Sequence, residues 1–214
     1  MSKKYNSLIV VPMKNPNNSK SRLSDTLTRE ARRRLAILLF RNTIDVLINS
    51  LKLSEKNFDI AVITNSDQIS EIAKKKDILV IEDDTDPVLS RSITIASNWA
   101  KFNSYKSMCV IPADLADPKI KDIISFISYP LPERGLVITP SIDLGTNALH
   151  VSPVNLIKFQ YGKKSSLKHI NSAKNVGVTP IMLPFDSLRF DVDTSSDLKE
   201  LLAINPDLAE TVKI

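Results

Sequence analysis

Three aspartates carry the chemistry that this chain offers most clearly. Asp114 follows an apolar run, and Asp191 and Asp193 stand two residues apart near the C-terminal end. In an extended segment, side chains two apart project to the same side, so Asp191 and Asp193 can reach one point. Paired carboxylates suit Mg²⁺, which takes one or two of them together with substrate phosphates. The alternative is that Asp191 and Asp193 only cap the following helix, because this acidic spacing is common.

A cationic loop near the front of the chain is the second candidate. The apolar run Leu8–Val11 is typical of a strand buried on both faces, and Pro12 ends it because proline has no N–H to donate. The loop then carries Lys14, Lys20 and Arg22 among Asn, Pro and Ser residues, and we expect it to be exposed. These cations can neutralise a polyphosphate, or they can be ordinary solvated charges. With a metal site nearby, the loop would suit phosphoryl or nucleotidyl transfer.

Two of the four glycines indicate further binding turns. In a chain so poor in glycine, Gly145 and Gly162 each predict a positive φ or a close approach of the backbone to something else. Thr146 and Asn147 follow Gly145 and add polar side chains to its backbone N–H groups. The segment from Gly162 to Ser165, G-K-K-S, precedes a predicted helix whose N-terminus would favour an anion.

The remaining titratable residues give weaker signals. The acidic run 82–86 could bind a metal, but adjacent carboxylates point in different directions, so a solvated turn is favoured. His150 and His169 are too far apart in sequence to indicate a metal pair, and we expect each to be structural. The single Cys109 lies in an apolar run, which predicts a buried thiol, and it excludes an internal disulfide.

Composition places the chain among globular proteins. It has 214 residues, of which 43% are hydrophobic and 25% charged, and this predicts one domain spanning 1–214. The net charge of +5 fits a small anionic substrate, whereas the spread of the basic residues argues against nucleic acid. We expect no membrane partner, because no apolar run approaches spanning length, and a cytoplasmic location, because the N-terminal apolar run is too short for a signal peptide.

Predicted strands and helices alternate along the chain. Strands are expected at 8–11, 59–64, 78–81, 107–111, 135–139, 147–151 and 180–183. Helices are expected at 29–51, 67–76, 87–102, 118–128, 166–174 and 195–203, with Thr28 and Ser195 able to cap the first and the last. This alternation predicts a single-domain, Rossmann-like three-layer α/β sandwich, with a mostly parallel mixed sheet and helices on both faces. Ligands bind such sheets at the carboxyl ends of the strands.

Taken in order, these segments resemble the 2-phospho-L-lactate guanylyltransferase family, a branch of the nucleotidyltransferases with a glycosyltransferase-A-like, nucleotide-diphospho-sugar transferase-like fold. The matching segments are V-P-M-K and K-S-R-L at the front, I-P-A-D-L at 111–115, G-T-N-A-L at 145–149, F-Q-Y-G-K-K-S at 159–165, His169, and D-V-D-T-S-S-D-L at 191–198. Each segment is modest alone, but the ordered set covers nearly the whole chain.

The resemblance implies an activity and a set of partners. The family transfers GMP from GTP to a small phosphorylated acid, 2-phospho-L-lactate or phosphoenolpyruvate, releasing pyrophosphate in deazaflavin coenzyme biosynthesis. The expected partners are therefore GTP and such an acid, with a homodimer possible.

The resemblance also implies roles for individual residues. It implies Mg²⁺ ligation by Asp114, Asp191 and Asp193. It places the acid against Thr146, Asn147, Gly162 and Ser165, and the nucleotide against Pro12, Lys14, Lys20 and Arg22. Lys14, Lys20, Arg22 and Asp114 would be the catalytic residues.

The chain departs from the family pattern in several segments. The family's G-L-N-x-A-L segment, associated with the nucleobase, reads V-L-S-R-S-I here, at Val88–Ile93. Lys163 and Lys164 replace a glycine-proline pair and could suit a more anionic acid. Two alternatives therefore stay open: a nucleotidyltransferase with another base or acceptor, and a nucleotide-binding paralogue without turnover. The three aspartates argue against the paralogue, because a binding module has less need of them.

Overall fold

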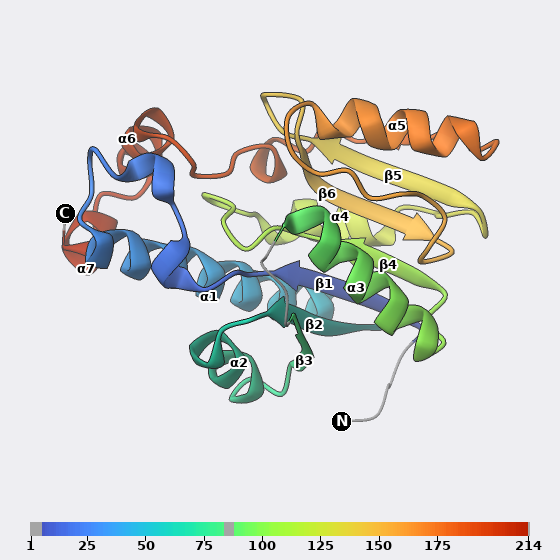
Figure 1. The fold of residues 1–214 in the computed structure, drawn as a ribbon, viewed down its shortest axis with the longest axis horizontal. Helices are drawn as coiled ribbons and strands as arrows, with labels where there is room; N and C mark the ends of the chain where they lie inside the picture. The colour runs from blue at the N-terminus through green and yellow to red at the C-terminus, as the bar shows by residue number, and fades with distance from the viewer. Residues whose placement is uncertain (1–5, 84–87, 214) are drawn as a thin grey trace.

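The chain winds around a central twisted sheet in the computed structural model, which describes residues 6–83 and 88–213 (Figure 1). The described residues form seven strands in the order β3-β2-β1-β4-β6-β5-β7. The strands are β1 (Ser7–Pro12), β2 (Phe58–Thr64), β3 (Leu79–Glu82), β4 (Ser107–Val110), β5 (Gly135–Pro140), β6 (Thr146–Ser152) and β7 (Ile181–Met182). Strand β6 pairs antiparallel with β4 and β5, and every other pair is parallel. The predicted mostly parallel mixed sheet is confirmed.

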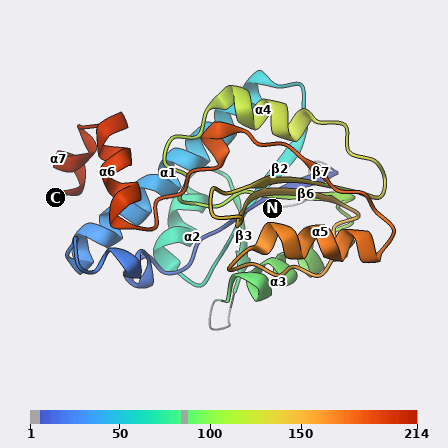
Figure 2. The same cartoon turned by 90° about the horizontal axis from the view of Figure 1, so that it is seen from above.

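Helices cover both faces of the sheet, as Figure 2 shows from above. One face carries α1 (Arg29–Leu53), α2 (Asp67–Lys74) and α4 (Ile120–Ser128), which contribute Phe40, Ile69 and Phe126 to one apolar core. The other face carries α3 (Leu89–Phe102) and α5 (Ser165–Asn175), which contribute Ile93 and Ala173 to a second core. The predicted three-layer sandwich is therefore confirmed.

Strand β1 shows why the sequence folds in this way. Ile9 and Val11 point into the first core, and Leu8 and Val10 point into the second. All four side chains are fully buried, which explains a continuous apolar run instead of alternation. Helix α1 then begins as predicted, because the hydroxyl of Thr28 accepts a hydrogen bond from the N–H of Ala31.

The antiparallel direction of β6 decides where the site can form. The carboxyl ends of β1, β2, β3 and β4 lie at one edge of the sheet. Because β6 runs the opposite way, its first residues, Thr146 and Asn147, lie at this same edge. Segments that are far apart in sequence therefore meet there.

A third apolar cluster supports this edge from one side. It joins α1 to the two C-terminal helices, α6 (Ser195–Ile204) and α7 (Leu208–Val212). The buried residues Leu23, Ala116 and Val192 belong to it, and each lies within three residues of a charged candidate. Packing of these apolar neighbours fixes the three charged segments relative to one another.

The structure differs from the sequence expectations at several element ends. Helix α4 begins at Ile120 instead of Pro118, and the cap of α6 is Thr194 instead of Ser195, because Thr194 and Asp197 form a capping box. The short helix α7 was not predicted. In the acidic run, Asp84 and Asp86 lie outside the described residues. Among the helices of the described chain, none combines the length and apolar character that crossing a bilayer requires.

Candidate active site

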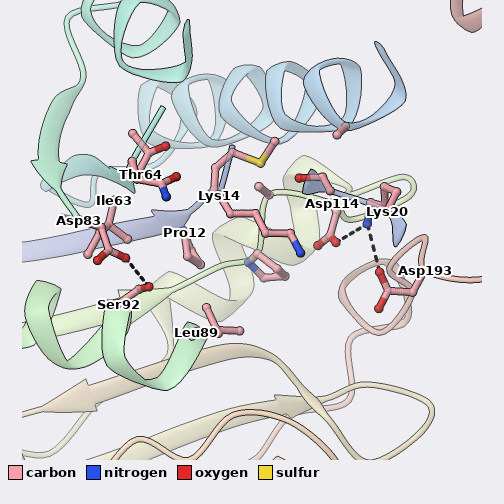
Figure 3. A pocket seen from close by; sticks show the side chains of 16 residues that line it. Pro12, Lys14, Lys20, Ile63, Thr64, Asp83, Leu89, Ser92, Asp114 and Asp193 are labelled. Carbon is pink, nitrogen blue, oxygen red and sulfur yellow. Dashed lines mark hydrogen bonds and ion pairs between the residues drawn. The ribbon is translucent and has the colours of Figure 1, made fainter. Parts of the chain in front are cut away.

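A cavity of about 290 Å³ opens at this edge of the sheet (Figure 3). Residues that follow β1, β2, β3 and β4 line it, together with the first turns of α3. The lining residues are Pro12, Met13, Lys14, Ser19, Lys20, Ala36, Ile63, Thr64, Asn65, Asp83, Leu89, Ser92, Pro112, Ala113, Asp114 and Asp193. The cavity thus contains five of the residues singled out in sequence: Pro12, Lys14, Lys20, Asp114 and Asp193.

Lys20 is the buried cation at one end of this cavity. Its side chain is only 4% exposed, and its ammonium forms ion pairs with Asp114 and, at 3.3 Å, with Asp193. Burial by itself lowers the pKa of Lys20, but the two carboxylates raise it above its ordinary value. The expectation of an exposed loop is therefore wrong at Lys20. Its backbone has a φ of 55°, and its side chain is buried despite the polar sequence around it.

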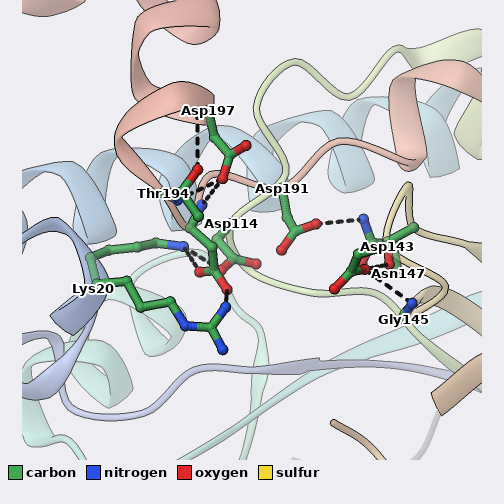
Figure 4. Close-up of polar contacts among 11 residues, drawn as sticks. Lys20, Asp114, Asp143, Gly145, Asn147, Asp191, Thr194 and Asp197 are labelled. Carbon is green, nitrogen blue, oxygen red and sulfur yellow. Dashed lines mark hydrogen bonds and ion pairs between the residues drawn. The ribbon is translucent and has the colours of Figure 1, made fainter. Parts of the chain in front are cut away.

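Three carboxylates converge beside Lys20 (Figure 4). One oxygen from each of Asp114, Asp191 and Asp193 lies within 4.8 Å of the other two. Burial and the charges of Asp114 and Asp193 raise the pKa of Asp191 to about 6, although a hydrogen bond from Asn147 opposes this shift. A carboxylate with a raised pKa is one whose negative charge is poorly compensated.

Backbone hydrogen bonds hold the carboxylates together. Leu115 and Asp191 form an antiparallel bridge, and the N–H of Val192 donates to the carbonyl oxygen of Asp114 at 3.2 Å. The carboxylate of Asp197 accepts from the N–H groups of Asp193 and Thr194, at 3.0 and 2.6 Å. Asp197 therefore positions Asp193. Sequence reasoning missed this role, although the T-S-S-D spacing of a capping box was visible.

The carboxylates of Asp114, Asp191 and Asp193 fit a divalent metal ion. Three carboxylate oxygens gathered within 4.8 Å of one another are the kind of ligands that a hard cation such as Mg²⁺ prefers. Burial and the charges of Asp114 and Asp193 outweigh the partial compensation from the Lys20 ammonium, so the pKa of Asp191 stays raised. A divalent cation held by Asp114, Asp191 and Asp193 would complete that compensation.

The other two cations of the loop are exposed. Lys14 lies at the cavity and is exposed. The Arg22 side chain is 72% exposed and lies 3.6 Å from Asp193. Both side chains can turn toward a bound anion, and an exposed ion pair such as that of Arg22 contributes little to stability. The loop thus combines the buried cation of Lys20 with the two exposed cations of Lys14 and Arg22.

A second group of polar side chains lies where β6 begins, outside the cavity lining. The Oγ1 atom of Thr146 accepts a hydrogen bond from the Ser165 hydroxyl at 3.0 Å and lies 3.0 Å from Nδ1 of His169. The N–H of Gln160 donates to Nε2 of His169 at 2.9 Å. Burial lowers the pKa of His169 to about 4, so the ring is neutral at pH 7. We call Thr146, Ser165 and His169 the hydroxyl cluster.

The hydrogen bonds of His169 determine how Thr146 is oriented. A backbone N–H can only donate, so Nε2 of the neutral ring accepts, and the ring proton must lie on Nδ1. Nδ1–H therefore donates to Thr146. Since Oγ1 of Thr146 then accepts from both His169 and Ser165, its own proton remains to be donated to a third group.

Asn147 connects the hydroxyl cluster to the carboxylates. Its Nδ2 donates to Asp191 at 3.0 Å, so Thr146 and Asn147, which are consecutive in β6, contact the hydroxyl cluster and the carboxylates respectively.

Gly145 and Gly162 each show one of the two features expected of them, a close backbone approach or a positive φ. Gly162 has φ of 109°, and a Cβ on Gly145 would lie 2.5 Å from Oγ of Ser141.

The anion-holding turn expected from G-K-K-S falls at the N-terminus of α5, where two backbone N–H groups already have protein partners. The N–H of Ser165 already donates to the carbonyl of Gly162, and the N–H of Ser166 donates to that of Leu144. Protein oxygens thus occupy the two donors that an anion would use first.

Within the acidic run, Asp83 departs from the expected solvated turn. Asp83 is only 3% exposed and accepts a hydrogen bond from the Ser92 hydroxyl at 2.5 Å. Both residues line the cavity. The sequence did not single out Asp83 within the acidic run, because a shift of one residue at the end of a strand decides which side chain turns inward.

Known proteins are similar to this chain over most of its length. It is 34% identical to the 3-phospho-D-glycerate guanylyltransferase of Colwellia psychrerythraea, over 92% of this chain and 90% of that protein. It is 27% identical to the 2-phospho-L-lactate guanylyltransferase of Methanocaldococcus vulcanius, over 91% and 83%. It is 26% identical to the phosphoenolpyruvate guanylyltransferase of Thermobaculum terrenum, over 93% and 84%.

Solved structures show the same fold. A nucleotidyl transferase from Methanothermobacter thermautotrophicus superposes with a TM-score of 0.63 at 12% identity, covering 93% of this chain and 98% of that one. A cytidylyltransferase from Leptospira borgpetersenii superposes with a TM-score of 0.59 at 12% identity, covering 98% and 97%. Residues 7–208 match the family described as "Guanylyl transferase CofC like". With relatives named guanylyltransferases aligned along nearly its whole length, the chain belongs to the CofC-like guanylyltransferase family, a family of nucleotidyltransferases.

Proposed function

We propose that this protein is a Mg²⁺-dependent guanylyltransferase that transfers GMP from GTP to a small phosphorylated acid and releases pyrophosphate. The observation that carries the proposal is the buried Lys20 ammonium, paired with Asp114 and Asp193 beside a cavity that Lys14 also lines. Cations and a cluster of carboxylates at one end of this cavity suit a triphosphate with its metal ion.

The reaction needs no nucleophile from the protein. A phosphate oxygen of the acid attacks the α-phosphorus of GTP, a new P–O–P bond forms, and the bond to the β-phosphate breaks with its electrons leaving on pyrophosphate. Lys14, Lys20 and Arg22 hold the triphosphate and offset the charge of the leaving group. Mg²⁺ held by Asp114, Asp191 and Asp193 would supply positive charge at the α-phosphate. The protein contributes position and charge.

The hydroxyl cluster is the proposed acid site. Thr146 has a proton to donate, and Asn147 connects this site to the carboxylates. Relatives act on 2-phospho-L-lactate and phosphoenolpyruvate, and the relative at 34% identity is named for 3-phospho-D-glycerate. That higher identity favours 3-phosphoglycerate as a further acceptor beside the first two. With 2-phospholactate or phosphoenolpyruvate as acceptor, the product would serve deazaflavin coenzyme biosynthesis.

A substrate matrix tests the proposal. GTP, ATP, CTP and UTP are each combined with 2-phospholactate, phosphoenolpyruvate and 3-phosphoglycerate, and pyrophosphate release is measured with Mg²⁺ and with excess chelator. We expect GTP to be used with at least one of these acids, only when the metal is present. Absence of pyrophosphate release from every GTP mixture would overturn the proposal, and turnover with CTP alone would assign another base.

A further inference from the structure

Asn65, which follows the end of β2, ties the cationic loop to the sheet. The N–H of Asn15 in this loop donates to Oδ1 of Asn65 at 3.1 Å, although the two residues are 50 positions apart. Just before them, the N–H of Met13 donates to the carbonyl of Ile63 at 3.0 Å. The loop therefore starts beside the end of β2, and the Asn65 side chain makes the next contact between the two segments.

Asn15 passes this contact on toward Lys20. Its carbonyl oxygen accepts from the Ser19 hydroxyl at 3.2 Å, and its side-chain oxygen accepts from the N–H of Asn17 at 3.0 Å. Ser19 is 6% exposed and directly precedes Lys20, whose ammonium forms the ion pairs at the end of the cavity. A series of hydrogen bonds thus connects the end of β2 to the residue before the buried cation.

The partner of Asn65 fixes the orientation of its amide. A backbone N–H can only donate, so Oδ1 faces Asn15, and the two N–H groups of Nδ2 point elsewhere. The Asn65 side chain lines the cavity, and no residue in the described part of the chain offers Nδ2 an acceptor. By contrast, the hydroxyls of Ser19 and Ser92, which also line the cavity, already donate to protein oxygens. Asn65 thus presents an oriented neutral donor.

Asn65 belongs to the end of the cavity away from the phosphate machinery. In Figure 3, Thr64 and Ile63 lie at one side and Lys20 at the other, and Asn65 directly follows Thr64. The apolar side chains of Ile63 and Leu89 also line the cavity. Cations suit phosphates, whereas apolar walls with a few polar groups suit an organic ring. A nucleotide would therefore place its triphosphate at Lys20 and its base near Asn65.

We propose that Asn65 recognises the 6-oxo group of guanine through Nδ2 while its Oδ1 positions the cationic loop; this inference rests on the proposed function. Guanine has the carbonyl oxygen O6 at the position where adenine has an amino group. The carbonyl accepts from Nδ2–H, whereas the amino group of adenine would meet the amide with donor against donor. Because one amide makes both contacts, a bound base and the loop that carries Lys20 are held relative to each other.

Exchange of the amide for a carboxylate separates the two contacts. Asn65→Asp keeps an oxygen for the N–H of Asn15 and replaces Nδ2 with an acceptor. We expect kcat/KM for GTP and for ITP, which both carry O6, to fall by about 10-fold or more. ATP and 2,6-diaminopurine riboside triphosphate carry an amino group instead, so the ATP:GTP ratio in kcat/KM should rise by about 100-fold.

Two further variants serve as matched controls. Asn17→Asp adds the same charge at an exposed loop residue that does not line the cavity, and it should leave the ATP:GTP ratio unchanged. Asn65→Ala removes both contacts, so it should use ATP less efficiently than Asn65→Asp does. The reverse order would overturn the positioning of the loop by Asn65.

The contrary outcomes distinguish this inference from the proposed function. If the wild type does not use GTP, the proposed function itself fails. If the wild type uses GTP but Asn65→Asp keeps the wild-type ATP:GTP ratio, the inference is overturned and the proposed function stands. Equal losses with GTP, ITP and ATP would leave only the loop contact and would also overturn it. If Asn65→Asp does not fold, the wild type decides: equal use of GTP and 2,6-diaminopurine riboside triphosphate contradicts the proposal, and a preference for GTP of about 10-fold or more supports it.

Discussion

The carboxylate cluster (Asp114, Asp191 and Asp193) and the hydroxyl cluster lie side by side at one edge of the sheet, yet one is charged and the other is neutral. In the first, Asp114, Asp191 and Asp193 lie close together beside Lys20, and burial together with the charges of Asp114 and Asp193 raises the pKa of Asp191. In the second, neutral groups are buried and hydrogen-bonded to one another. We therefore expect a bound cation to stabilise the first region, whereas the second region is organised by its own hydrogen bonds.

The largest expected effect comes from exchanging two of the carboxylates separately. Asp114→Asn and Asp191→Asn should each lower turnover by about a thousandfold or more, because each removes a proposed metal ligand. Their metal-free melting temperatures should move in opposite directions. Asp114→Asn removes one of the two carboxylate partners of the buried Lys20 ammonium, whereas Asp191→Asn removes a partly buried carboxylate that forms no ion pair with Lys20. Substantial activity in both variants would exclude the metal assignment, and equal melting shifts would contradict the division of roles.

The next largest effect is the difference in stability between variants of the buried Lys20 and of the exposed Arg22. Lys20→Met keeps the length of the side chain but leaves the carboxylates without their ammonium, so we expect a loss of about 1–3 kcal/mol in the free energy of unfolding. Added Mg²⁺ should restore part of this loss. Arg22→Ala should change stability by less than about 1 kcal/mol and should raise the KM for GTP, because its side chain is exposed. Chemical unfolding with and without Mg²⁺, together with steady-state kinetics, measures both. Equal destabilisation by the two variants would show that the burial of Lys20 is unimportant.

The hydroxyl cluster should respond in substrate affinity more than in metal dependence. Thr146→Val leaves the donors of His169 and Ser165 without their acceptor, at a cost of about 1–3 kcal/mol, and it should raise the KM for the acid more than that for GTP. Thr146→Ser keeps the oxygen and should retain most of the affinity. An increase confined to the KM for GTP would place Thr146 on the nucleotide side.

Two substitutions of His169 separate its two hydrogen bonds. Asparagine places an amide N–H near the position of Nδ1 and can keep the bond to Thr146, whereas glutamine reaches the position of Nε2 and can keep the bond from Gln160. We expect His169→Asn to retain a KM for the acid closer to that of the wild type than His169→Gln does. The reverse order in steady-state kinetics would assign His169 a purely structural role.

The smallest expected effect is a pH dependence of stability. Burial lowers the pKa of His150 and His169 to about 4, below the ordinary value of 6.5. Between these values the unfolded chain binds more protons than the native one, so stability should fall as the pH falls from about 6.5 to about 4. Asp191, whose pKa of about 6 exceeds its ordinary value of 3.8, opposes this trend in metal-free protein. Thermal melting should therefore show a steeper decline for Asp191→Asn than for the wild type, and identical slopes would contradict the raised pKa.

The sequence by itself determined the layers of this protein. Strands buried on both faces read as continuous apolar runs, as in β1, and strands that alternate with helices form a mostly parallel sheet. These are local patterns, so they can be read from neighbouring residues. The same reasoning placed Asp114 after a strand and Asp191 and Asp193 on one extended segment, and it led to the family through their order.

Only the tertiary structure decided which polar residues turn inward. Lys20 belongs to a loop of Asn, Pro and Ser that was expected to be exposed, and Asp83 belongs to an acidic run that was expected to be solvated. Each has partners from another segment: Lys20 pairs with Asp114 and Asp193, and Asp83 accepts a hydrogen bond from Ser92. The proton on Nδ1 of His169 likewise depends on the N–H of Gln160. The burial of a charge depends on partners that the fold brings into contact, and the sequence around the charge does not identify them.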